Sequence, residues 1–236
     1  MILASKHFNR TYTFGRLLGI KFDRDFTSFN LTGENAINQL HSNLKDQWTS
    51  FKESDRERIQ EIFFLEKEKF HLRDSINNVD EILRLELSYN IEREKLLKSK
   101  FDALLQEVFV KNKMVHLYVS NWKWFVRDPF QNPYDLKQIL NAKKTENFFL
   151  LERSGTFDVK SDSNIFEFPL SEYQYFLIQQ FEKPRNLKEV HQQFINLFEI
   201  SNKEEEKELQ NITESLIEDL IFRRFIVSTP GNQPEP

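Results

Sequence analysis

Three short strands followed by three capped helices fill the last ninety residues, and this order restricts the chain to few folds. Strands are predicted over 147–153, 156–161 and 165–168, helices over 172–182, 187–199 and 204–224, and a terminal strand over 225–229. A small sheet beside three helices is found in winged-helix DNA readers and in modules that clamp a peptide. The function depends on which of the two is present.

Each of these helices is preceded by a side chain that can cap it. Ser171, Asn186 and Ser201 each stand three residues before a Glu or Gln. This is the spacing of a capping box, in which the two side chains bind free backbone amides reciprocally. The three signals predict where the helices begin.

The front of the chain is predicted to be mostly helical. Apolar residues at spacings of three and four indicate a helix over 34–48, and His41 lies on that apolar stripe, so we interpret it as a packed core histidine. Ser54 and Glu57 form a capping box that would open a helix reaching about residue 76.

A third front helix is predicted to begin after Asn78 and to run to about residue 110 without a Gly or Pro. Two adjacent helices of this size favour an antiparallel hairpin. The predicted helix carries one apolar stripe, made of Leu83, Leu87, Ile91, Leu97, Phe101, Leu104 and Val108.

The helical period stops at residues 114–126, where Tyr118, Trp122 and Trp124 share one face of a predicted strand. The best linker candidate is 142–145. We therefore expect an α+β protein with two domains and a tail. These are a mostly helical domain with a long helical hairpin and an N-terminal arm (1–145), a winged-helix-like domain of three strands and three helices (146–229), and a flexible tail (230–236).

The amino-acid composition excludes or disfavours several classes of functional site. The chain has no Cys, which excludes disulfides and thiolate sites, and its 5 Gly are too scattered to cradle a phosphate. The 5 His have no metal-ligand spacing, and Glu66 and Glu68 are interpreted as solvated rather than catalytic. We expect no catalytic residue, no metal and no cofactor. No signal peptide or membrane-spanning stretch is evident, so we expect a cytoplasmic protein.

Charge separates the two readings of the C-terminal pattern. Residues 203–224, the third helix of the pattern, hold seven acidic and four basic residues, a net charge of −3. A helix that enters the major groove needs cations to neutralise phosphates. Nucleic-acid binding is therefore disfavoured, although a winged-helix transcription regulator with a helical dimerisation domain remains the alternative.

A peptide clamp needs an open strand edge instead, and residues 165–168 form a short aromatic strand that could supply one. Alternation places Phe166 and Phe168 on one face of this strand, and Ile165 and Glu167 on the other.

Around this strand the sequence resembles the PqqD-like peptide-recognition domain of ribosomal peptide biosynthesis. The resemblance covers about residues 147–228 and rests on three segments, which are Leu170-Ser171 at the first helix, Asn186-Leu-Lys-Glu-Val190 at the second, and Leu220 to Val227 at the end.

The resemblance implies that a leader peptide adds as a strand beside residues 165–168 and packs on the third helix. The implied peptide-binding residues are Ile165, Phe166, Glu167, Phe168, Leu216, Leu220, Arg223 and Arg224. Arg223 and Arg224 could equally be only a favourable cationic helix end.

We therefore expect a non-catalytic accessory protein that presents a precursor peptide to a modifying enzyme as part of a hetero-oligomer. By analogy with such pairs, the partner would be a multinuclear non-haem iron oxygenase. The front domain would dock that enzyme, with Trp122 and Trp124 as candidate contacts.

Overall fold

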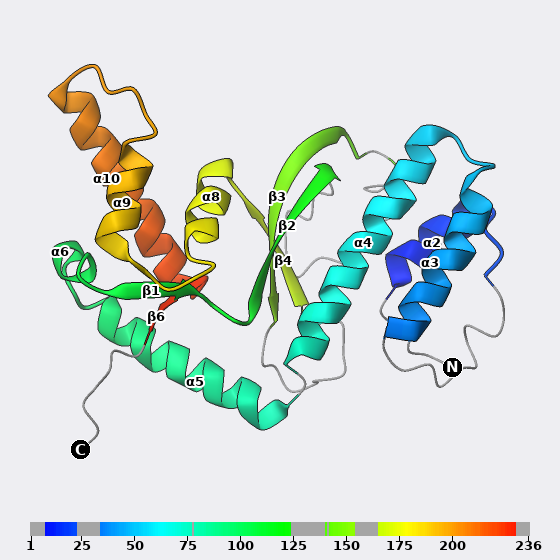
Figure 1. Ribbon diagram of the computed structural model, residues 1–236, viewed down its shortest axis with the longest axis horizontal. Coiled ribbons are helices and arrows are strands. Elements are labelled where there is room, and N and C mark those ends of the chain that lie inside the picture. The colour runs from blue at the N-terminus through cyan, green and yellow to red at the C-terminus, as the bar shows by residue number, and fades with distance from the viewer. Residues whose placement is uncertain are drawn as a thin grey trace. The chain divides into compact units, whose positions relative to one another are not determined.

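The computed structural model describes residues 8–22, 34–76, 78–123, 140, 142–153 and 165–229. Helices and two small three-stranded sheets make up these residues, which confirms the α+β class. The chain divides into two compact units, drawn together in Figure 1. Unit 1 combines Met1–Asn77 with Tyr118–Pro169, and unit 2 combines Asn78–Leu117 with Leu170–Pro236.

Unit 1 is a sheet covered by helices. Its elements are α2 (Asn9–Leu17), α3 (Glu34–Trp48), α4 (Glu53–Ser75), β3 (Lys144–Arg153), β4 (Ile165–Leu170) except its last residue, and β2 (Val115–Trp122) from Tyr118 onward. The strands are ordered β2-β3-β4, and α4 contacts β3 as well as α2 and α3 (Figure 1). The long helix α4 is therefore the centre of this unit.

Aromatic rings fill the space between the helices of unit 1. Phe63 of α4 is 1% exposed, and its ring lies 5.4 Å from that of Phe8. The His41 ring stacks on Phe63 at 5.1 Å and an interplanar angle of 7°. This contact agrees with the prediction that His41 packs rather than binds a metal.

Unit 2 joins a second sheet to a set of helices. Its elements are α5 (Val79–Leu96), α6 (Phe101–Leu104), β1 (Val108–Lys111), α8 (Glu172–Gln180), β5 (Arg185–Asn186), α9 (Leu187–Ile195), α10 (Lys203–Phe222) and β6 (Ile226–Ser228). Strand β1 is central and pairs antiparallel with both β5 and β6. Its Phe109 is fully buried and meets the Phe181 ring edge-to-face at 6.3 Å.

The predicted helix over 79–110 is wrong, because α5 ends at Leu96 and a turn follows. Val108–Lys111 instead forms the central strand of a sheet, where β-branched and aromatic side chains pack well. The predicted apolar stripe is not the buried face of α5 either. Ile82 and Leu96 are buried, whereas Leu83, Leu87 and Ile91 are at least half exposed.

The two long helices expected to form one hairpin lie in different units, α4 in unit 1 and α5 in unit 2. The predicted linker over 142–145 overlaps the start of β3, and a boundary near residue 145 does not separate the two units.

The strands and helices predicted for residues 147–229 do not form one domain but are distributed over the two units. Strands β3 and β4 belong to unit 1, whereas α8, α9 and α10 belong to unit 2, and the terminal strand β6 pairs with β1. The predicted strand over 156–161 lies outside the described residues.

Two of the predicted capping boxes are displaced by the actual helix starts. Helix α4 begins at Glu53 after Lys52, without a side-chain cap, so Ser54 and Glu57 lie inside the helix. Helix α10 is capped by Asn202, not by Ser201. The predicted cap of α8 by Ser171 is confirmed as a capping box with Gln174, and Asn186 caps α9.

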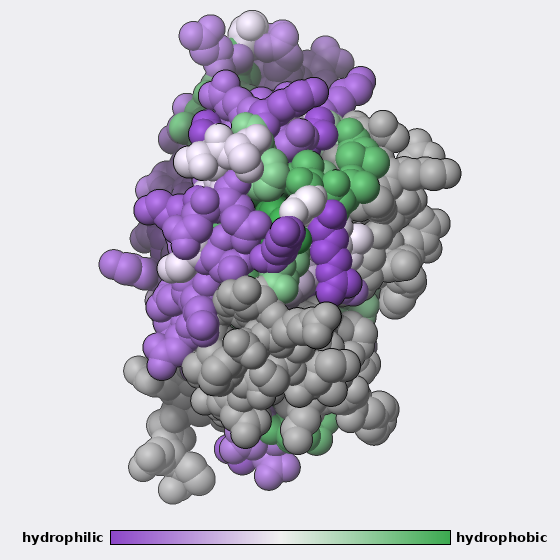
Figure 2. Space-filling model, turned by 90° about the vertical axis from the view of Figure 1, so that its right-hand side faces the viewer, coloured by the Kyte–Doolittle hydropathy of each residue, from purple (hydrophilic) through white to green (hydrophobic). Residues whose placement is uncertain are grey.

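Much of the described surface is polar. On the face shown in Figure 2, hydrophilic side chains cover most of the described area, and a smaller hydrophobic patch lies beside them. Among the described residues, no helix has the length and apolar character that crossing a membrane requires.

The cap of α10 gives a test with a built-in control. The Asn202 side chain accepts from the amides of Glu204 and Glu205, whereas Ser201 contributes only its backbone amide, which donates to Glu205. We expect Asn202→Ala to lower the free energy of unfolding by about 1 kcal/mol and Ser201→Ala by only a few tenths. Urea unfolding followed by circular dichroism measures both. Equal losses, or a larger loss for Ser201→Ala, would contradict this assignment of the cap.

Candidate functional site

Strand β4 is an edge strand with two different faces. It pairs with β3 on one side, and no strand of the described residues pairs with its other side. Ile165 and Glu167 are buried, whereas Phe166 and Phe168 are half-buried on the opposite face with their rings 6.3 Å apart. The alternation predicted for these four residues is therefore confirmed. Pro169, which has no amide to donate, suits a strand at an edge.

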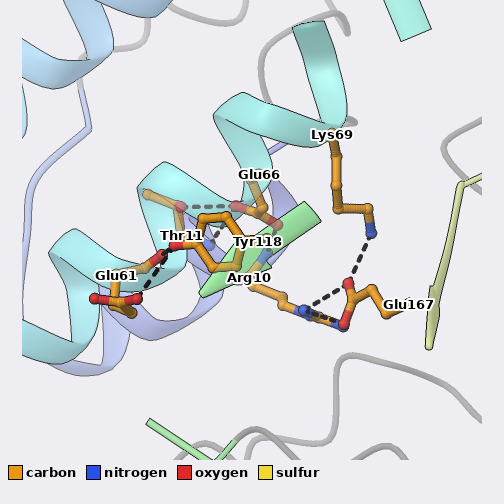
Figure 3. A network of polar contacts seen from close by, with 7 residues as sticks. All are labelled: Arg10, Thr11, Glu61, Glu66, Lys69, Tyr118 and Glu167. Carbon is orange, nitrogen blue, oxygen red and sulfur yellow. Dashed lines mark hydrogen bonds and ion pairs between the residues drawn. The ribbon is translucent and has the colours of Figure 1, made fainter. Parts of the chain in front are cut away.

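A buried ion-pair cluster holds β4 against the helices of unit 1 (Figure 3). The Glu167 carboxylate lies 2.9 Å from Nη1 of Arg10 in α2 and 3.0 Å from Nζ of Lys69 in α4. The side chains of Arg10 and Glu167 are 4% and 7% exposed. Two cations from two helices thus converge on one carboxylate of the edge strand.

The cations decide the charge state of Glu167. Burial by itself would raise the pKa of this carboxyl, but Arg10 and Lys69 outweigh burial and lower it to about 2. Glu167 is therefore ionised throughout the physiological range. Since its folded pKa is below its ordinary value, its contribution to stability is present above about pH 4.5 and is lost as the pH falls towards 2.

A second buried carboxylate, Glu66 of α4, binds the first turn of α2 (Figure 3). Its oxygens accept from the amides of Arg10 and Thr11 at 2.7 and 3.0 Å, and from Thr11 Oγ1 at 2.6 Å. Phe8, at the N-cap position of α2, makes no side-chain cap. Glu66 therefore supplies from another helix the acceptor that the free amides require.

Glu66 has a different protonation behaviour from Glu167. Burial raises its pKa to about 7, although the hydrogen bonds from Thr11 and the charge of Arg10 oppose the rise. A carboxyl that titrates near neutrality can act as an acid or base in an enzyme. Here, however, the side chain is 3% exposed and both oxygens are engaged by α2, so the arrangement fastens a helix.

Strand β2 is tied to α4 by a third polar contact. Tyr118 Oη lies 3.2 Å from Oε1 of Glu61, and the amide of Asn121 donates to the same oxygen at 3.3 Å. Burial, followed by the charge of Glu61, raises the pKa of Tyr118 well above its usual range, so it remains a donor. Among the described residues, no three His, Asp or Glu side chains are grouped so as to hold a metal ion.

The implied peptide-binding residues of the third helix belong to unit 2, whereas those of β4, Ile165 to Phe168, belong to unit 1. Leu220 is fully buried in the core, so it is not available as the wall of a groove, and Leu216 is half-buried. Arg223 is exposed, and its Nε donates to Asp219 at 2.8 Å. Arg224 has a positive φ of 62°, and its Nη1 donates to Asn90 Oδ1.

Trp122 is not a surface residue. It is 4% exposed in the core of unit 1, and the Arg58 guanidinium lies over its ring at 4.5 Å. Its role as a docking contact is therefore wrong, because its ring already packs within the unit. Trp124 lies outside the described residues.

Two residues of this site were missed or misread in the sequence. Arg10 gave no periodic signal, and Glu66 was interpreted as solvated. Yet Glu66 lies on the same helical face as Ile59, Ile62, Phe63 and Phe70, all of which are buried. A carboxylate on an apolar stripe is a sign of a buried partner, which is the reasoning that placed His41 correctly.

No family model, curated protein or solved structure matches this chain. Its function is therefore inferred from its own residues.

The ion-pair cluster predicts a large loss of stability when its anion is removed. Glu167→Gln takes away the negative charge that Arg10 and Lys69 share inside the protein, and we expect a cost of about 3 kcal/mol or more. Glu57→Gln is the matched control, since Glu57 pairs with Lys144 at the surface of the same unit, where such pairs contribute about 0–1 kcal/mol. Chemical unfolding at pH 7 compares the two. A loss below 1 kcal/mol for Glu167→Gln would show that the cluster does not hold β4.

The raised pKa of Glu66 predicts a pH dependence of opposite sign to that of Glu167. The folded state holds a proton on Glu66 up to about pH 7, whereas the unfolded chain releases it near 4.5. The free energy of unfolding therefore falls between these pH values, by on the order of 1–3 kcal/mol. The stability of the wild type minus that of Glu66→Gln, measured from pH 4.5 to 8, should decrease as the pH rises. A difference that is flat or increases with pH would contradict the raised pKa.

Proposed function

We propose that this chain is a non-catalytic accessory protein that captures the leader of a ribosomally made precursor peptide and presents it to a modifying enzyme. The leader adds as an extra strand along the edge of β4 that pairs with no strand of the described residues. The partner enzyme, a multinuclear non-haem iron oxygenase in the favoured case, contributes the metal and the chemistry. In this proposal the protein works in the cytoplasm as one subunit of a hetero-oligomer.

The observation that carries the proposal is the edge of β4. Strand addition requires free backbone donors and acceptors on a strand that does not move. The Glu167 carboxylate, held by Arg10 and Lys69, fixes the buried face of β4. Phe166 and Phe168 on the other face provide half-buried apolar surface beside the edge. A guest strand would thus gain backbone hydrogen bonds from the edge and apolar contacts from the two rings.

The order α8, β5, α9, α10, β6 in unit 2 supports a winged-helix-like assignment as part of this proposal, since that fold also alternates helices with short strands. Helix α10 contains seven acidic and two basic residues between Lys203 and Phe222. A phosphate backbone would be repelled by this helix. The observation favours peptide capture over the alternative of a transcription regulator.

The test is peptide binding by a variant of the edge. The probes are synthetic peptides made from the short open reading frames beside this gene, and fluorescence anisotropy measures their affinity for the full chain. We expect Phe166→Asp to weaken binding at least tenfold, because a charge replaces apolar surface beside the guest strand, with circular dichroism unchanged. Phe222→Asp in unit 2 is the control, and it should leave this affinity within twofold.

Three results would contradict the proposal. One is unfolding of Phe166→Asp, which would place Phe166 in the core instead of beside a groove. Another is an unchanged affinity in that variant. The third is salt-sensitive binding of duplex DNA without affinity for any of the peptides, which would favour the transcription regulator.

A further inference from the structure

Unit 2 contains an open groove, lined by both apolar and polar side chains, that the proposed function does not use. It has a volume of ≈ 360 Å³, within the range of about 300–1,000 Å³ that is typical of ligand pockets. Its walls come from the end of α5 and the turn after it, from α6, and from the C-terminal half of α10. All of these segments belong to unit 2, so the groove is complete within one unit.

Apolar side chains lie at both the base and the mouth of the groove, together with the polar lining residues Ser99, Ser215, Glu218 and Asp219. Leu104 and Ile221 are 4% and 2% exposed and form the base. Leu97 and Phe222 are 44% and 56% exposed and flank the opening. Exposed Leu and Phe side chains beside a hollow are costly to leave in water, and they mark a surface that binds another apolar group. The Arg93 guanidinium lies over the Phe222 ring at 5.8 Å and supports its orientation.

One carboxylate of the lining, Glu218, has two further carboxylates, Glu214 and Asp102, in its neighbourhood. Glu218 borders the groove, and burial together with the charges of Asp102 and Glu218 raises the pKa of Glu214. Glu214 is thus close enough to Asp102 and to Glu218 to be repelled by both. No cation among the described residues forms an ion pair with Asp102, Glu214 or Glu218, whereas the neighbouring Asp219 is satisfied by Arg223 and Gln174. These three carboxylates therefore contribute negative charge beside the groove.

We propose that this groove is a docking site for a basic amphipathic segment of a partner protein. An apolar side chain of the segment inserts between Leu97 and Phe222. A neighbouring Lys or Arg meets the carboxylates of Asp102, Glu214 and Glu218. Charge complementarity selects this occupant, since an acidic segment or a phosphate would be repelled by the same carboxylates.

The site differs from the edge of β4 in its chemistry. Strand addition at β4 uses backbone groups and accepts many sequences, whereas the groove recognises one apolar side chain and an adjacent positive charge. The inference therefore does not rest on the proposed function, and either can fail without the other.

A display library of random twelve-residue peptides, selected on the full-length protein, provides the probe. Clones are counter-selected on the double variant Glu214→Gln/Glu218→Gln, which removes charge from positions that are not in the core and should leave circular dichroism unchanged. We expect the enriched peptides to combine a large apolar residue with Lys or Arg within a few positions. Their affinity should fall at least tenfold in the double variant and in Phe222→Asp, stay within twofold in Phe166→Asp, and weaken as salt rises.

Other outcomes would overturn the assignment. These are a selection without enriched peptides, enrichment of acidic or uncharged peptides, and binding that survives both the double variant and Phe222→Asp. Peptides that lose affinity in Phe166→Asp but not in Phe222→Asp would belong to the edge of β4 and would likewise count against the groove. If Phe222→Asp alone unfolds, Leu97→Asp on the opposite wall replaces it in the same comparison.

Discussion

The Glu167 carboxylate organises unit 1, because it cannot be buried unless cations come to it. Arg10 and Lys69 lie 157 and 98 residues away in the sequence, on two different helices, and both reach this one side chain. Removing a charge from water costs several kcal/mol, which an ion pair offsets only with good geometry. The N-terminal helix, the long helix and the edge strand therefore have to be in place together. Such a cluster adds little net stability, but it fixes which elements meet.

The same reasoning explains how α2 is attached. Its first turn has free amides and no cap of its own, and Glu66 of α4 binds two of them. Arg10 thus contributes twice, with its backbone amide to Glu66 and with its guanidinium to Glu167. One turn of helix α2 is held between two carboxylates that have opposite pKa shifts. Raising the pH towards 7 and beyond lowers the net contribution of Glu66 to stability, because its ionised form is buried, and lowering the pH towards 2 removes the contribution of Glu167, so the pair is most favourable between the two pKa values.

The sequence predicted correctly those features that depend on residues close together in the chain. The helix over 34–48 and the caps at Asn78, Ser171 and Asn186 depend on residues a few positions apart, and the structure has them all. The end of α5 was missed because its sequence permits helix through residue 110. Only pairing with β5 and β6, which lie more than 70 residues later, makes Val108–Lys111 a strand. The stripe along α5 failed for a related reason, since periodicity finds an apolar face but not whether the protein covers it.

The residues of the candidate site show the same difference between features set by neighbouring residues and features set by distant ones. Alternation was enough to place Phe166 and Glu167 on opposite faces of β4, but a sequence does not state that the partner of Glu167 is Arg10. Trp122 illustrates the converse error, in which an aromatic side chain suited to an interface is used by the core instead. The sequence is enough to show that the acidic residues of α10 disfavour DNA binding. The proposal that some of them attract a basic ligand depends on the groove beside them, which only the structure describes. Carboxylates that form no ion pair with the described residues, next to exposed apolar side chains, would define a ligand by its charge, whereas a strand edge would define one only by its backbone.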